Sequence, residues 1–244
     1  MPTPGNETHL SQSEAKNTGA SGDTTKTNTV VVSRPFMEIL IGGPYTKNRK
    51  DHTYGHAALR VFIAEGQEFV YDYGRYGKTW AGGSEGEGIL RFWNSFSAYI
   101  TGENALGRTT VGFVYYLEKQ QAEAIVNYFG GVIAAGKQQG QPKKNEKDVV
   151  VVTTYRLAND YHAIQSNCVT ISLDGTKASG INVYHNPEKY QELRGMSWTE
   201  KLAAKTQSYP KNAIFMPFDL QEMLEGAKTG GAKNSYNRRE TYKK

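Results

Sequence analysis

The chain has 244 residues, of which 38% are hydrophobic and 22% are charged. This length and composition fit one medium-sized domain or two small ones, and we expect one domain with loose ends. No run of about 18 apolar residues occurs, which excludes a membrane-spanning helix. The polar N-terminus shows no basic start, apolar stretch or small-residue cleavage site. We therefore expect a soluble chain that is synthesised in the cytoplasm without a signal peptide.

The net charge of +5 comes from 29 basic and 24 acidic residues, and it predicts a weak attraction to anionic polymers. Much of the positive charge lies in "KNRK" at 47–50 and in the tail from 228 to 244. We interpret both as solvated, mobile segments and expect no specific nucleic-acid partner, because the chain has no zinc-finger, helix-turn-helix or RNP-like motif.

A single cysteine rules out an intramolecular disulfide and any zinc site that needs paired thiolates. The histidines are scattered without the spacing of metal ligands. We therefore expect neither a metal nor another cofactor.

Taken in chain order, the first 32 residues are rich in Thr, Ser, Gly and Asn and are predicted to be a disordered polar head. A packed domain is predicted over 33–225, and a disordered basic tail over 226–244. Within the domain, "VVVSRPFMEILIGG" begins the core and ends in a turn. The segment 55–77, "GHAALRVFIAEGQEFVYDYGRYG", contains two β-rich runs and is predicted to be a hairpin.

The middle of the chain alternates between predicted strands and helices. The glycine-rich "WAGGSEGEG" lacks the spacing of a phosphate loop and is interpreted as a flexible connection. Hydrophobic spacing predicts helices over 89–100 and 118–135, and strands are expected over 109–117 and 149–157. In "SNCVTISLDG" Ser166 or Asn167 can cap a helix that begins close to Cys168. Beyond 205 the chain is predicted to be helical with turns as far as the tail that begins at 226.

Cys168 is the candidate nucleophile. An ordinary thiol, with a pKa near 8.5, is only a few per cent thiolate at neutral pH. A helix N-terminus and a nearby imidazole both stabilise a thiolate. Cys168 is predicted to lie at a helix N-terminus, and His56 stands at the start of a strand, where a ring can face such a terminus. His162, six residues before the cysteine, is the alternative base.

Asp72, on the second strand of the hairpin, is the candidate for orienting the His56 ring. An odd-numbered loop centred on Ala64 would place Asp72 directly opposite His56, whereas a two-residue turn would pair His56 with Arg75. If Asp72 does not hold the ring, Asp160 is the next candidate.

The pairing of "YGHAALRV" with "QSNCVTIS", supported by "FVYDYGRYG", resembles the circularly permuted branch of the papain-like, NlpC-type cysteine hydrolases, which includes relatives of lecithin retinol acyltransferase. The similar region runs from Phe36 to Lys177. The resemblance implies an α+β fold in which a central antiparallel sheet packs against the nucleophile helix. It also implies that Cys168 is the nucleophile, His56 the general base and Asp72 the orienting residue.

The same resemblance suggests where a substrate would be held and what it would be. The Cys168 N–H would form part of an oxyanion hole, and Tyr155, Tyr161 and Asn167 are candidates for further donors. The implied activity is amide hydrolysis, with peptidoglycan peptides as the expected substrate. A lipid acyltransferase or phospholipase and a non-catalytic binding module are the alternatives. Without a signal peptide, a wall-cleaving enzyme would be an effector exported by a dedicated secretion system, and an immunity protein would be its expected partner.

Overall fold

The computed structural model describes residues 7–8, 32–47, 50–81, 84–193, 196–206 and 213–243. The predicted disordered head lies almost wholly outside these residues. Its described parts are β1 (Glu7–Thr8) and β2 (Val32–Ser33), which pair with each other.

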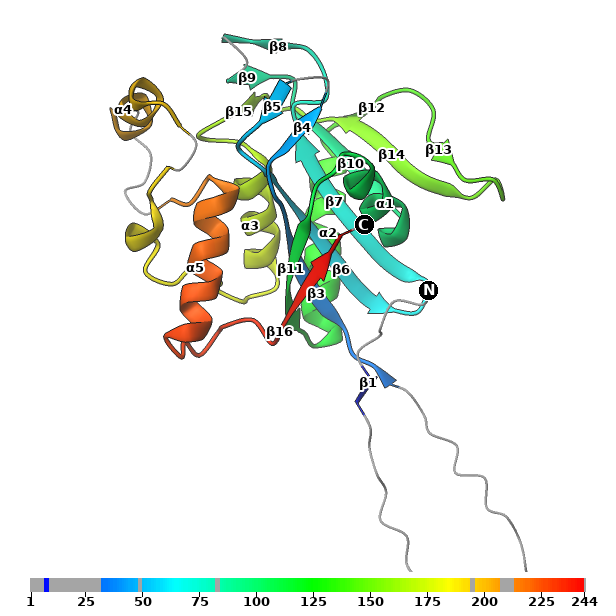
Figure 1. Cartoon of the computed structure of the whole chain (residues 1–244). Helices are drawn as coiled ribbons and strands as arrows, with labels where there is room; N and C mark the ends of the chain where they lie inside the picture. The colour runs from blue at the N-terminus through cyan, green and yellow to red at the C-terminus, as the bar shows by residue number, and fades with distance from the viewer. Residues whose placement is uncertain are drawn as a thin grey trace, which may run out of the picture.

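A nine-stranded sheet forms the centre of the molecule (Figure 1). Its order is β12-β14-β10-β7-β6-β3-β11-β16, and β13 also pairs with β14. Every pairing in it is antiparallel. The strands are β3 (Phe36–Gly42), β6 (His56–Ala64), β7 (Gln67–Gly74), β10 (Ile89–Trp93), β11 (Thr110–Tyr116), β12 (Lys137–Gln138), β13 (Lys143–Lys144), β14 (Val150–Arg156) and β16 (Arg238–Tyr242).

Two smaller sheets lie at one end of the central sheet (Figure 1). One pairs β4 (Tyr45–Lys47) with β5 (Lys50–His52), and the other joins β8 (Thr79–Trp80), β9 (Glu85–Gly86) and β15 (Tyr161–His162). The helices are α1 (Phe96–Ala105), α2 (Lys119–Ala134), α3 (Cys168–Ala178), α4 (Trp198–Thr206), α5 (Pro217–Thr229) and the 3-10 turn η2 (Pro187–Tyr190).

Helices cover both faces of the central sheet, so its middle strands β3 and β6 are buried along nearly their whole length. Along β6, Ala57 and Leu59 enter the main core, which also contains side chains of α2, α3 and α5. The intervening Ala58 enters a second core with Phe96 and Tyr99 of α1. This alternation follows from the two-residue period of a strand. The expected α+β architecture, with an antiparallel sheet and the cysteine-bearing helix packed on it, is thereby confirmed.

Two predicted elements differ from the structure. Residues 89–100 do not form one helix: β10 ends at Trp93, and α1 starts at Phe96 behind the N-cap Ser95, whose side chain accepts from the Ala98 N–H at 3.2 Å. The apolar residues of this segment recur at helical spacing, but the first of them are the β-favouring Ile, Leu, Phe and Trp of a central strand. Periodicity over so short a run did not separate the two structures.

The tail predicted to be disordered over 226–244 is instead part of the fold as far as the structure describes it. α5 continues to Thr229, and β16 pairs with β11. The Tyr242 hydroxyl donates to Glu38 at 2.8 Å, and the charge of Arg239 is paired with Glu225 at 3.2 Å. Strand pairing with β11, the Tyr242–Glu38 hydrogen bond and the Arg239–Glu225 ion pair therefore hold the tail in the fold despite its basic composition.

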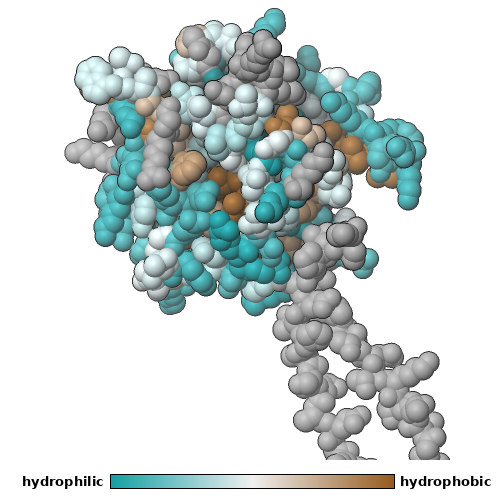
Figure 2. Space-filling model, viewed as in Figure 1, coloured by the Kyte–Doolittle hydropathy of each residue, from teal (hydrophilic) through white to brown (hydrophobic). Residues whose placement is uncertain are grey.

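The surface in view is largely hydrophilic, with small apolar areas between the helices and the sheet (Figure 2). Among the described residues, the helices are too short or too polar for any of them to cross a bilayer.

Candidate active site

Cys168 is the first residue of α3, and Asn167 is its N-cap. The Asn167 side-chain oxygen accepts from the N–H groups of Val169 at 2.9 Å and Thr170 at 3.1 Å, which is the capping geometry that this residue type favours. Its amide nitrogen donates to the carbonyl groups of Ala163 at 2.6 Å and Phe215 at 2.9 Å. Both donors of the Asn167 amide are thus used inside the protein. Asn167 therefore fixes the start of the helix, and its proposed contact with a substrate stays a prediction.

The thiol of Cys168 faces the start of β6. It is a hydrogen-bonding partner of the His56 side chain and of the Ala57 backbone N–H. Both Cys168 and His56 are buried, with 6% and 8% of their surface exposed. The structure brings Cys168 and His56 together from segments more than a hundred residues apart.

Gly55 explains why a glycine precedes His56. Its φ is +69°, a conformation that side chains other than glycine rarely adopt. A Cβ atom at this position would lie 2.7 Å from the carbonyl oxygen of Gly42 on the neighbouring strand. The Gly-His sequence therefore lets the chain turn tightly into β6, with the histidine at the rim of the sheet.

His56 and Asp72 lie on one face of the sheet, a diagonal step apart. β6 and β7 pair Leu59 with Tyr71, and the same register continued to the strand end places His56 opposite Gly74. Asp72 is two residues from Gly74 and therefore shares the face of His56. The His56 Nε2 atom lies 2.6 Å from the Asp72 Oδ1 atom. Because Nε2 is engaged in this way, Nδ1 is the ring nitrogen left for the thiol.

The register of this hairpin is neither of the two predicted. Its turn has two residues, as in the alternative that pairs His56 with Arg75, but a β-bulge between Phe62 and Ala64 adds a residue to β6. The bulge moves the partner of His56 by one position. The expectation that Asp72 would stand directly opposite His56 is wrong, although the two residues do meet.

Asp72 is fully buried and holds two further side chains besides His56. Arg91, directly opposite on β10, donates to its Oδ2 atom from Nε at 2.8 Å and from a terminal nitrogen at 2.5 Å. Tyr76 donates its hydroxyl to Oδ1 at 2.7 Å, and that hydroxyl also lies 3.2 Å from His56 Nε2. The Arg91 guanidinium lies 3.6 Å from the centroid of the Tyr76 ring. These contacts fix the carboxylate in one orientation.

Neighbouring charges in the site shift the pKa values of His56, Cys168 and Asp72 towards their charged forms. Burial disfavours the protonated ring, yet the carboxylate of Asp72 and the thiolate of Cys168 outweigh it and raise the pKa of His56 to about 10. Burial also opposes ionisation of the thiol, but the His56 charge and the hydrogen bonds from His56 and Ala57 lower the Cys168 pKa. The pKa of Asp72 is held well below its usual value against burial by Arg91 and His56. The directions of these shifts favour a thiolate–imidazolium pair over a neutral thiol and a neutral ring.

Neither Arg91 nor Tyr76 is predicted from the sequence to belong to this site. Arg91 was interpreted as part of a helix, so its position opposite Asp72 was hidden. Tyr76 lies four residues after Asp72, just beyond β7, and 43% of its surface is exposed although its hydroxyl turns inward to the carboxylate. The only available signal was the short distance in sequence between Tyr76 and Asp72.

The two tyrosine candidates have different positions. Tyr161, on β15, stacks on Tyr73 with ring centroids 5.7 Å apart. Burial and the nearby charge of Cys168 both raise the Tyr161 pKa, so this ring belongs to the surroundings of the thiol. Tyr155 lies on β14 opposite Leu90 and packs against the main core. Of the two tyrosines, Tyr161 is therefore the one in the surroundings of Cys168.

The alternative base and the alternative carboxylate have other partners. The His162 Nδ1 atom accepts from the backbone N–H groups of Ile164 and Gln165, each at 3.3 Å. Asp160 forms an ion pair with Arg156. Neither residue takes the place that was predicted for His56 or Asp72.

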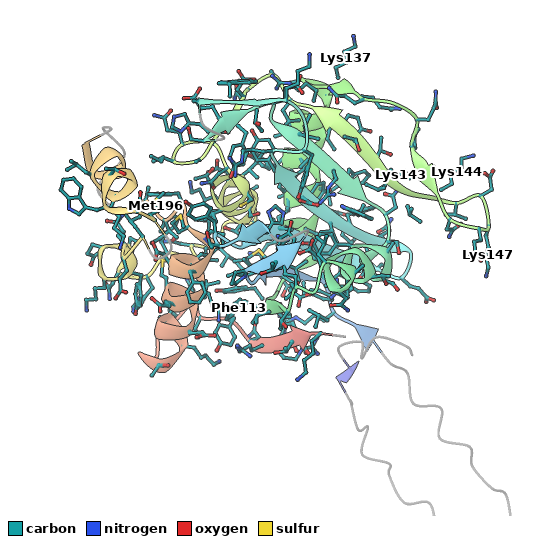
Figure 3. The ribbon with its side chains drawn as sticks, turned by 45° about the horizontal axis from the view of Figure 1, so that its top comes forward. Phe113, Lys137, Lys143, Lys144, Lys147 and Met196 are labelled. Atoms are coloured by element: carbon teal, nitrogen blue, oxygen red, sulfur yellow. The ribbon has the colours of Figure 1, made fainter. Side chains whose placement is uncertain are left out.

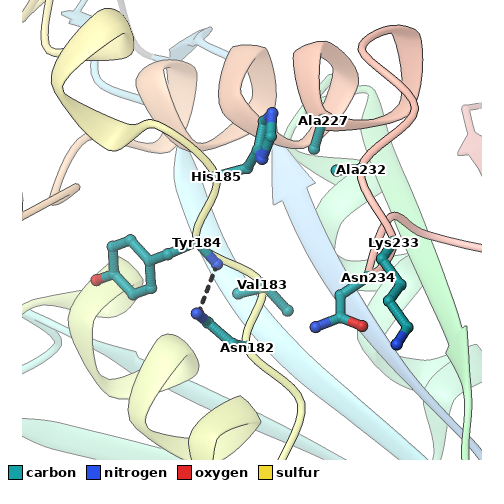
Figure 4. Close-up of a pocket in the computed structure, with 8 residues that line it drawn as sticks. All are labelled: Asn182, Val183, Tyr184, His185, Ala227, Ala232, Lys233 and Asn234. Atoms are coloured by element: carbon teal, nitrogen blue, oxygen red, sulfur yellow. Dashed lines mark hydrogen bonds between the residues drawn. The ribbon is translucent and has the colours of Figure 1, made fainter.

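Two other features lie apart from this site. A cavity of about 140 Å³ is lined by residues of the loop after α3, of the end of α5 and of the segment that follows α5 (Figure 4). The eight residues that line it include neither Cys168, His56 nor Asp72.

Exposed lysines gather at the edge of the sheet formed by β12, β13 and β14 (Figure 3). They are Lys137, Lys143, Lys144 and Lys147. In the part of the chain that the structure describes, no cluster of three or more His, Cys, Asp or Glu could hold a metal ion.

No protein-family model, curated protein or solved structure matches the chain.

Proposed function

We propose that the protein is a cysteine hydrolase that cleaves an amide bond through an acyl-enzyme on Cys168. The observation that carries the proposal is the continuous chain of contacts from the Cys168 thiol through the His56 ring to the buried carboxylate of Asp72. The order of these residues along the chain, and the position of the cysteine at a helix start beside an antiparallel sheet, support a permuted papain-like fold of the NlpC type.

In this mechanism the Cys168 thiolate attacks the carbonyl carbon of the substrate. The first turn of α3 leaves the Cys168 N–H without an acceptor among the described residues, whereas the N–H groups of Val169 and Thr170 are used by the cap. The Cys168 N–H is therefore available to donate to the oxygen that becomes negatively charged. A donor at this point, close to the positive end of the helix dipole, stabilises the tetrahedral intermediate.

Proton transfers run through His56. As an imidazolium it gives its proton to the departing amine, and a thioester forms between the acyl group and the Cys168 sulfur. The neutral ring then removes a proton from water, which attacks the thioester and releases a carboxylic acid. Asp72 stabilises the imidazolium in both steps, and Arg91 and Tyr76 hold Asp72 in place.

Peptidoglycan peptides are the substrate we propose. The positive charge of the chain, its hydrophilic surface and the resemblance to wall-cleaving enzymes support peptides over lipids. Cleavage of a competitor's wall would make the protein an effector, delivered by a dedicated secretion system and neutralised in the producing cell by an immunity protein.

Isolated sacculi provide the test. The purified protein should release new amino termini or shortened muropeptides, detected by mass spectrometry, and Cys168→Ala should abolish the release. Loss of acyl chains from phospholipid vesicles in a Cys168-dependent way, with unaltered sacculi, would replace the amidase by a lipid hydrolase. If neither substrate changes and Cys168 reacts slowly with alkylating agents, the protein is a binding module.

A further inference from the structure

Arg75 is an exposed cation at the rim of the candidate active site. It directly follows β7, whose last residue Gly74 stands opposite His56 in the register described above. The Arg75 guanidinium lies 5.4 Å from the centroid of the Tyr161 ring. An arginine over an aromatic face is held by a cation–π contact while its N–H groups stay available for hydrogen bonds.

Tyr161 connects this cation to the nucleophile. Its ring stacks on Tyr73, and the Tyr73 hydroxyl lies 3.4 Å from the side-chain oxygen of Ser166, two residues before Cys168. Cys168 also contributes to the raised pKa of Tyr161. Arg75, Tyr161 and Tyr73 therefore form one wall that begins at solvent and ends at the start of α3.

Two carboxylates at the small sheet and directly after it already have partners. Glu85 accepts from the Trp80 indole at 2.9 Å and faces His162 at 3.8 Å. Glu87 accepts from the Lys78 backbone N–H at 2.8 Å and lies 3.9 Å from Arg156, which also pairs with Asp160. Among the side chains that the structure describes, none forms an ion pair with the Arg75 guanidinium.

We infer that Arg75 binds a carboxylate of the substrate beside the acyl group that Cys168 attacks. The enzyme would thereby select acyl substrates with a free carboxylate close to the scissile bond. The inference rests on the proposed function and deepens it by naming the substrate class. A planar guanidinium suits a carboxylate because two parallel N–H groups can donate to its two oxygens. Wall peptides carry free carboxylates, whereas the acyl chains of lipids are neutral.

The sole cysteine of the chain allows a test that needs no knowledge of the natural substrate. Iodoacetate and iodoacetamide both alkylate a thiolate: the sulfur forms a bond to the CH₂ carbon, the carbon–iodine bond breaks and iodide leaves. The two reagents differ in that only iodoacetate carries a carboxylate. We expect Arg75→Gln to lower the ratio of the iodoacetate rate to the iodoacetamide rate about 3- to 10-fold, on the scale of an exposed arginine–carboxylate contact. The iodoacetamide rate itself should be unchanged.

Lys78→Gln is the matched control, because it removes one positive charge from the same exposed segment. If Lys78→Gln lowers the ratio as much as Arg75→Gln, the effect is one of general surface charge and the inference is wrong. An unchanged ratio in Arg75→Gln contradicts it as well. If iodoacetamide reacts fast with the wild-type protein, the proposed cysteine hydrolase function is supported whether or not Arg75→Gln changes the ratio. If neither reagent reacts with the folded protein, the proposed function fails and the inference falls with it.

Discussion

Replacing His56 by alanine should lower turnover at least about 10³-fold, because the variant loses both the group that holds Cys168 as a thiolate and the group that protonates the leaving amine. His56 stabilises the thiolate through its charge and its hydrogen bond, which are the main causes of the lowered Cys168 pKa. Turnover is measured on the muropeptide that the wild-type protein cleaves fastest. Circular dichroism establishes that the variant is folded.

His162→Ala is the control for this prediction, since His162 is the histidine closest in sequence to the nucleophile. Its ring accepts two backbone N–H groups in the loop before α3, so the change should cost less than about tenfold in turnover. A large loss in His162→Ala together with a small loss in His56→Ala would transfer the base role to His162.

Asp72→Asn should lower turnover by roughly 10- to 10⁴-fold, the range seen when an orienting carboxylate loses its charge. An asparagine can still contact His56 but cannot stabilise the imidazolium by charge. The pKa of His56, about 10 in the wild-type protein, should therefore fall towards its ordinary value of about 6.5. Titration of the His56 ring signals by NMR measures this shift, and the alkaline limb of the turnover profile should move down with it.

Arg91→Gln separates the role of the Asp72 charge from that of its ion pair. This variant breaks the contact between Arg91 and Asp72 but keeps the carboxylate beside His56. It should destabilise the fold, because it leaves a buried charge with one partner fewer. Its turnover, measured well below the unfolding temperature, should exceed that of Asp72→Asn. Equal turnover in Asp72→Asn and the wild-type protein would show that another group orients the ring.

The parts of the site that local sequence determines were predictable. An asparagine before a short apolar run predicted the helix start at Cys168, because capping depends on side-chain chemistry within three residues. A glycine before His56 and the β-rich residues after it predicted the strand and its hairpin. These two local signals placed both Cys168 and His56 at the ends of regular elements.

The remaining contacts depend on register and on distant partners. A single-residue bulge in β6 decides which residue faces His56, and no turn residue reveals it. The role of Arg91 depends on recognising β10 as a strand, which its helix-like spacing concealed. The pairing of β16 with β11 depends on partners such as Glu38, about two hundred positions away, which composition alone does not indicate.

The pH dependence of Cys168 alkylation by iodoacetamide tests the thiolate–imidazolium pair most directly. Because His56 lowers the pKa of the thiol, the alkylation rate of the wild-type protein should rise through its midpoint well below the ordinary thiol pKa of about 8.5 and stay high through neutral pH. In His56→Ala the midpoint should move above that value, since burial and the Asp72 charge are then no longer opposed by the His56 charge, and the Ala57 hydrogen bond remains as the smaller opposing effect. A wild-type midpoint at or above about 8.5, or one that His56→Ala leaves in place, would contradict an activated cysteine at this site.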